Sequence, residues 1–183
     1  DAITANACIT GTGIDIGSRT TKIVRVRDGV IIDAVVFDTG HDPVSGIART
    51  ARDFGDETVV ATGYGRHLAE KRLTCRTVTE IRACARGAKH LSPLCTGAID
   101  IGGQDTKALE INTGGGFGRF EMNDRCAAGT GRFLEVMAKT LGYSVEEFGG
   151  EALRADLPAQ VNSMCTVVAE SEVISMITRG DSR

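Results

Sequence analysis

Two aspartates in matching surroundings have the side chains and spacing needed to bind phosphate. Asp15 and Asp100 each end an apolar run, precede an Ile-Gly pair and are followed seven positions later by a lysine. A strand-end aspartate can hold Mg²⁺ against phosphate groups, and glycines let backbone N–H groups approach an anion. The repeat therefore predicts two phosphate-binding loops in two related lobes, with Lys22 able to reach a phosphate oxygen. Either aspartate could instead be an ordinary turn residue that follows a buried strand.

Two cysteines are candidates for binding a metal cluster. Cys126 and Cys165 come immediately before predicted helices at residues 129–141 and 166–178. A thiol at a helix N-terminus has a lowered pKa, because free N–H groups and the helix dipole stabilise the thiolate and would also favour an anionic cluster. One chain offers only two such ligands, so a four-thiolate cluster would need a two-fold dimer. A disulfide between the two cysteines, or two ordinary cysteines at helix starts, are the alternatives.

The elements that must position these residues alternate between strands and helices. A strand at residues 8–16 leads to Gly17, and an Asp28-Gly29 pair predicts a hairpin of strands 22–27 and 30–37. Further strands are predicted at residues 58–61, 97–101, 106–112 and 117–122, and helices at residues 42–54, 66–72, 79–90, 129–141, 145–148 (one turn) and 166–178. The pattern predicts an α/β fold with an N-terminal lobe at residues 1–94 and a second lobe at residues 95–183.

Composition and charge exclude several classes of protein. The chain has 183 residues and 23 glycines, about twice the usual share of ~7%, which is typical of tight turns and ligand-binding loops. A net charge of −3 with mixed signs argues against nucleic-acid binding, and no apolar run approaches the ~18 residues that span a membrane. The six cysteines form no CxxC pair, which indicates free thiols in a cytoplasmic protein. Neither a GxxxxGK[ST] P-loop nor a strand–GxGxxG–helix motif is present.

Five segments point to one family when they are taken together. They are residues 13–18, 61–66, 99–105, 122–134 and 165–175. In this order, over nearly the whole chain, they resemble the activator ATPases of 2-hydroxyacyl-CoA dehydratases, a group that includes the ATPase subunits of benzoyl-CoA reductase. The paired Asp-Ile-Gly segments alone would indicate only the wider superfamily of acetate kinase, sugar kinases, Hsp70 and actin.

The resemblance implies an actin-like (ribonuclease H-like) fold of two lobes with mixed sheets flanked by helices, which binds ATP or ADP with Mg²⁺ between the lobes. It also implies a [4Fe-4S] cluster shared across a two-fold dimer, or with a homologous subunit, with Cys126 and Cys165 as ligands. Asp15 and Asp100 would bind magnesium and, with Gln104, would be catalytic. The residues that would line the nucleotide are Gly13, Gly17, Ser18, Thr20, Thr21, Lys22, Gly102, Gly103, Gln104, Asp105, Gly129 and Gly131.

The activity implied by the resemblance is ATP-dependent electron transfer. ATP hydrolysis would change the angle between subunits, and one electron at very low potential would pass from the cluster to an acyl-CoA dehydratase or reductase. A ferredoxin or flavodoxin would donate that electron. Family members usually continue past the second cysteine helix, so the second lobe is expected to be C-terminally incomplete. A sugar or carboxylate kinase of the same superfamily, or a truncated nucleotide-binding module without hydrolysis, are the alternatives.

Overall fold

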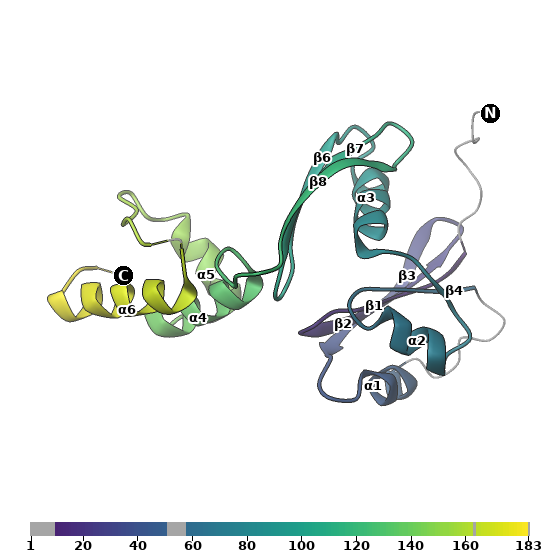
Figure 1. Ribbon diagram of the computed structural model, residues 1–183, viewed down its shortest axis with the longest axis horizontal. Helices are drawn as coiled ribbons and strands as arrows, with labels where there is room; N and C mark the ends of the chain where they lie inside the picture. Colours follow the sequence, from purple (N-terminus) through teal and green to yellow (C-terminus); the bar gives the residue numbers. More distant parts are fainter. Residues whose placement is uncertain (1–9, 51–57, 163, 183) are drawn as a thin grey trace. The chain divides into compact units, whose positions relative to one another are not determined.

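The computed structural model describes residues 10–50, 58–162 and 164–182 (Figure 1). Its contacts divide the chain into two compact units: Asp1–Ala98 with Leu109–Arg119, and Ile99–Ala108 with Phe120–Arg183. Each unit is described separately below. Across the described ranges, no helix is long and apolar enough to cross a lipid bilayer.

A five-stranded mixed sheet forms the centre of the first unit. Its strands are β1 (Gly11–Ile16), β2 (Thr20–Arg27), β3 (Val30–Asp38), β4 (Val59–Thr62) and β5 (Arg76–Thr77), in the order β3-β2-β1-β4-β5. Strands β1, β2 and β3 pair antiparallel, whereas β4 pairs parallel to both β1 and β5. Asp28 and Gly29 both have positive φ, at 52° and 77°, as the tight turn between β2 and β3 requires. The predicted hairpin is therefore confirmed.

Alternation along β1 separates its apolar residues from its aspartate. Ile14 and Ile16 are almost fully buried, so Asp15 between them points to the opposite face of the sheet. Helices α1 (Pro43–Thr50) and α2 (Arg66–Arg72) pack on the face that carries the isoleucines (Figure 1). The buried residues between the sheet and these helices form one apolar core cluster: Ile14, Ile16, Ile23, Ile47, Val59, Ala61 and Ala69. A third helix, α3 (Glu80–Leu91), completes the helices of the unit.

A second sheet contains the second Asp-Ile-Gly segment. It has three strands, β6 (Gly97–Ile101), β7 (Thr106–Ile111) and β8 (Phe117–Asn123), in the order β6-β7-β8, and residues of both units belong to it. Alternate residues of β7, from Lys107 to Ile111, are buried. These strands match the predicted ones within about two residues at each end, which is the usual uncertainty of such boundaries.

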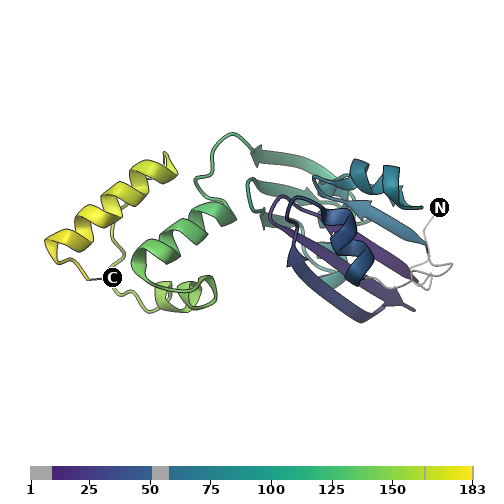
Figure 2. The same ribbon diagram turned by 90° about the horizontal axis from the view of Figure 1, so that it is seen from below.

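Three helices form the rest of the second unit: α4 (Gly131–Leu141), α5 (Val145–Ala152) and α6 (Thr166–Arg179) (Figure 2). Met137 of α4 packs with Ala169 and Val173 of α6 in a small apolar core. Helix α5 begins where it was predicted, at a capping box between Ser144 and Glu147, but it is twice as long as the single predicted turn because it continues through Gly149 and Gly150. Parts of the predicted strand 8–16 and helix 42–54 lie outside the described residues.

Candidate functional site

The first Asp-Ile-Gly segment places an accessible ion pair on the sheet. Asp15 of β1 lies opposite Lys22 of β2 in the antiparallel register. Lys22 Nζ donates to Asp15 Oδ2 at 3.0 Å, and the two side chains are 40% and 33% exposed. An exposed ion pair of this kind is weak in water. The Lys22 ammonium can therefore exchange part of its interaction with Asp15 for one with a bound anion.

The second carboxylate oxygen of this aspartate has no donor. Within the described residues, Asp15 Oδ1 is buried and makes no hydrogen bond. Because β4 pairs parallel to β1 with Thr62 opposite Asp15, the chain after β4 turns at the same sheet edge, and Gly63 there has φ of +83°. A Cβ on Gly63 would collide with Asp15 Oδ1. The structure thus keeps a carboxylate oxygen in a space without a protein partner, which suits a magnesium ion or a water bound to it.

The turn between β1 and β2 leaves no room for a side chain at its first position. Gly17 N donates to Thr20 O at 3.1 Å, and a Cβ on Gly17 would lie 2.8 Å from Thr20 O and 3.3 Å from Lys22 Nζ. Thr21 is fully buried, and its hydroxyl lies 3.0 Å from the hydroxyl of Thr39. The Thr39 hydroxyl in turn donates to Gly17 O at 2.8 Å. Thr21 therefore stabilises the turn from its buried side. The absence of a side chain at Gly17 leaves the other side of the turn accessible to an anion.

The second Asp-Ile-Gly segment holds its lysine differently. Lys107 is only 2% exposed, and its Nζ lies 2.8 Å from Asp105 Oδ1 and 3.7 Å from Asp100 Oδ2. The two carboxylate side chains are about one third exposed. A Cβ on Gly102 would collide with Asp105 Oδ1. Lys107 therefore stabilises the loop through its two ion pairs. It is buried whereas Lys22 is partly exposed, although both lysines follow their aspartates by seven residues.

The other predicted nucleotide residues occupy strands, turns and the entry to α4. Gly13 lies inside β1, Thr20 begins β2, and Ser18 and Gln104 are exposed in the two turns. Gly103 O accepts a hydrogen bond from Arg132 N at 3.0 Å. Asp15 belongs to the first unit and Asp100 to the second, so a cleft in which the two loops face one another stays a prediction.

The segment that carries Cys126 is closed by an asparagine that the sequence analysis did not single out. Asn123 Nδ2 donates to both Cys126 O and Ala128 O at 3.0 Å, and Asn123 Oδ1 accepts from Cys126 N at 3.3 Å. Asparagine side chains often hydrogen-bond to nearby backbone groups in turns, so the sequence could have predicted this role for Asn123. Gly129 follows with φ of +76° and turns the chain into α4.

The two candidate cluster cysteines belong to adjoining loops of the same unit. The Cys126 thiol donates to Met164 O at 3.4 Å, and Met164 directly precedes Cys165, the N-cap of α6. Hydrogen bonds from the backbone N–H groups of Val168 and Val167 lower the pKa of Cys165. Both thiols are free and half-buried. The structure therefore contains no disulfide between them, and the backbone N–H groups at the start of α6 favour the thiolate form of Cys165.

Within the described residues, the two cysteines do not belong to a larger cluster of metal-binding side chains. No group of three or more histidine, cysteine, aspartate or glutamate side chains is arranged to hold a metal ion in the described part of the chain. Two thiols alone leave a four-coordinate cluster unfinished. The two thiols would supply two of the four ligands of a cluster, and a second chain would supply the other two.

Comparison with known proteins identifies the family to which this chain belongs. The sequence profile of the BadF/BadG/BcrA/BcrD ATPase family matches residues 12–183. The activator of lactoyl-CoA dehydratase from Anaerotignum propionicum is 41% identical over 187 residues, which cover 93% of this chain and 69% of that protein.

Two crystal structures extend the likeness to the fold. Component A of the Acidaminococcus fermentans (R)-2-hydroxyglutaryl-CoA dehydratase superimposes with a TM-score of 0.85 at 36% identity, covering 96% of this chain and 70% of that one. The activator of the 2-hydroxyisocaproyl-CoA dehydratase from Clostridium difficile with bound ADPNP gives 0.82 at 37%, covering 94% and 67%. The predicted α/β fold is thus confirmed. The chain spans about two thirds of the length of each of these proteins.

Proposed function

Because the chain belongs to the BadF/BadG/BcrA/BcrD ATPase family, we propose that it couples ATP hydrolysis to electron transfer into an acyl-CoA dehydratase or reductase. The family predicted from the sequence is confirmed. Relatives are described as activators of lactoyl-CoA and 2-hydroxyisocaproyl-CoA dehydratases, and the solved structure of one of them has bound ADPNP. Membership makes this chain an ATPase relative. The electron-transfer role is what the family resemblance implies, and the two cysteines of this chain support it.

Asp15 and Lys22 support the nucleotide part of the proposal. Asp15 Oδ1 has a free acceptor, and Lys22 keeps 40% of its side chain exposed beside the narrow turn at Gly17. Lys22 would bind a phosphate oxygen, and backbone N–H groups of the turn would contact the same anion. Magnesium, when bound at Asp15, would neutralise phosphate charge. In the second loop, Asp100, Gly102, Gly103 and Gln104 would line the phosphates of the same nucleotide, and Gln104, which is exposed, would be a catalytic residue.

The observation that carries the electron-transfer part is the pairing of Cys126 and Cys165. The Cys126 thiol contacts the carbonyl beside Cys165, and the pKa of Cys165 is lowered by two backbone N–H groups. The first feature joins the loops of the two candidate ligands, and the second favours the thiolate form of Cys165, which is the form that binds a metal. A bound [4Fe-4S] cluster would supply a low-potential one-electron carrier. The chain provides two ligands, so a second copy or a homologous subunit would provide the others.

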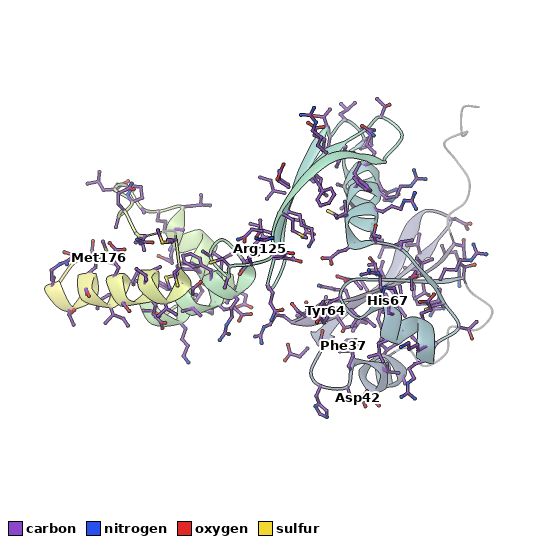
Figure 3. The ribbon with its side chains drawn as sticks, viewed as in Figure 1. Phe37, Asp42, Tyr64, His67, Arg125 and Met176 are labelled. Carbon is purple, nitrogen blue, oxygen red and sulfur yellow. The ribbon has the colours of Figure 1, made fainter. Side chains whose placement is uncertain are left out.

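The partners follow from this arrangement. A ferredoxin or flavodoxin would supply the electron, and a dehydratase or benzoyl-CoA reductase would receive it. Arg125 is exposed beside Cys126 in the loop between β8 and α4 (Figure 3). Its positive charge would face an acidic partner surface close to the electron source. Arg132, by contrast, is engaged in an ion pair with Glu135 at 3.0 Å.

Anaerobic iron analysis tests the proposal. We expect about four irons per dimer for the wild type and loss of nearly all iron in the Cys126→Ala and Cys165→Ala variants. Cys95→Ala is the matched control, because Cys95 is a half-buried free thiol in the other unit, and it should keep its iron. Unchanged iron content in Cys126→Ala would refute the ligand assignment. Nucleotide binding without hydrolysis would refute the ATPase part.

A further inference from the structure

The predicted second phosphate loop is bonded directly to the helix that follows Cys126. Gly131 N donates to Gly102 O at 2.8 Å, and Arg132 N donates to Gly103 O at 3.0 Å. The first N–H groups of an α-helix have no partner within the helix. At the start of α4 the carbonyls of this loop fill that role. The loop and the first turn of α4 are therefore parts of one hydrogen-bonded structure.

A side chain adds a third link between the same two segments. The Thr106 hydroxyl donates to Gly129 O at 2.6 Å. A Cβ on Gly131 would lie 3.1 Å from Gly102 O, so only glycine allows this close approach without a shift. Thr106 begins β7 and sits between Asp105 and Lys107, whose ion pair at 2.8 Å fixes the loop. The backbone that carries the Thr106 hydroxyl is thus held in place by the ion pair of its two neighbours.

The linked segment continues to the cysteine without a flexible break. Thr130 N donates to Ala127 O at 3.1 Å, which closes the turn before α4. Asn123 holds the carbonyls of Cys126 and Ala128 with one side-chain amide. A displacement of the Gly102 carbonyl would therefore move the turn and the Cys126 backbone together. Such a chain of contacts can carry coupling between two sites when one of its segments has two arrangements that both sites favour differently.

We propose that Thr106 is a positioning residue that transmits the state of the nucleotide loop to the Cys126 loop, with the Gly102 and Gly103 carbonyls as the other contacts. The proposal rests on the proposed function, because it takes residues 102–105 as a nucleotide loop and Cys126 as a cluster ligand. Nucleotide that shifts the loop would alter its bonds to α4, and the Cys126 thiol would move with that helix start. A purely structural cap would hold α4 equally well with and without nucleotide.

Hydrogen exchange of the full chain, purified anaerobically, distinguishes these roles. In the wild type, Mg-ADP should change the exchange rates of amides in residues 126–134. Thr106→Val keeps the shape of the side chain but removes the donor. It should abolish that nucleotide-dependent change and raise exchange roughly fivefold at these amides, the factor expected for one lost hydrogen bond. Thr106→Ser should restore both, and Thr113→Val, in an exposed turn, is the matched control.

The affinity for Mg-ADP, measured by calorimetry on the same samples, separates the two hypotheses. It should change less than about threefold in Thr106→Val, because Thr106 bonds the protein rather than the ligand. A nucleotide response of residues 126–134 that is the same in Thr106→Val and wild type would overturn the role of Thr106. Binding in the wild type with no response in that segment would overturn the coupling alone. Failure of the wild type to bind Mg-ADP would refute the proposed function, and with it the premise of the coupling.

Discussion

Replacement of the two lysines that follow the Asp-Ile-Gly segments should have opposite consequences. Lys107→Met leaves Asp105 and Asp100 without the buried ammonium that lies 2.8 and 3.7 Å from them. Breaking a buried ion pair costs about 3–5 kcal/mol, and the partial exposure of both carboxylates lowers the expected loss to about 2–4 kcal/mol. Lys22→Met breaks an exposed pair and should cost less than about 1 kcal/mol.

The functional effects should run the other way. Lys22→Met removes a candidate phosphate contact, and a lost charged hydrogen bond of about 1.5–3 kcal/mol predicts a roughly 10- to 150-fold weaker affinity for Mg-ATP. Lys107 is only 2% exposed, so it should contribute no direct phosphate contact, and Lys107→Met should change the affinity less than Lys22→Met, through the positions of Asp100 and Asp105. Lys71→Met, at an exposed position of α2, is the matched control for both variants.

Thermal melting followed by circular dichroism measures the stability half of this prediction. A change of 1 kcal/mol shifts the Tm of a protein of this size by about 2–4 °C, so Lys107→Met should melt roughly 5–15 °C below the wild type. Lys22→Met and Lys71→Met should stay within about 4 °C of it. The reasoning is refuted if Lys22→Met is as unstable as Lys107→Met, or if Lys107→Met melts like the control.

The other structural predictions concern a glycine and two thiols. Gly63→Ala should cost more than the about 1–2 kcal/mol of its left-handed backbone, because the new Cβ would also clash with Ile16 O, and it should weaken Mg-nucleotide binding because the Cβ displaces Asp15. Gly40→Ala, at φ +60° with open space around it, should lose only the backbone part in urea unfolding and keep the affinity; equal affinities in the two variants would contradict this. In iron-free protein, Cys165 should be alkylated at lower pH than Cys75, because backbone hydrogen bonds lower the pKa of Cys165 whereas burial, then Glu70, raises the pKa of Cys75. Mass spectrometry of iodoacetamide-treated protein across pH 6–9, about the range where thiols titrate, would contradict it if Cys75 reacted first.

The parts of the fold that local chemistry determines could be predicted from the sequence. The Asp28-Gly29 pair specifies the hairpin between β2 and β3, and both residues adopt the required positive φ. Helix α2 was predicted at the observed residues. Strand β5 has two residues and no periodic signal, and it forms only because β4 lies beside it. The predicted length of α5 was wrong at its C-terminal end, because Gly149 and Gly150 disfavour a helix interior and the observed helix nevertheless continues through them.

The candidate site was less accessible to sequence reasoning, because its geometry depends on contacts distant in the chain. The repeat treats Lys22 and Lys107 alike, whereas the structure leaves one exposed and buries the other between two carboxylates. The role of Gly63 against Asp15 depends on the parallel pairing of β1 with β4. Spacing could nominate Cys126 and Cys165, but not the contact that joins their loops through Met164.

The visible spectrum of the anaerobically purified protein, recorded during size-exclusion chromatography with mass detection, tests the central claim most directly. A [4Fe-4S] cluster held by Cys126 and Cys165 of two chains predicts a brown species at the mass of a dimer, whose spectrum changes when Mg-ATP and a reductant are added. The same colour should be absent from Cys126→Ala. A colourless monomer, with or without Mg-ATP, would contradict the account.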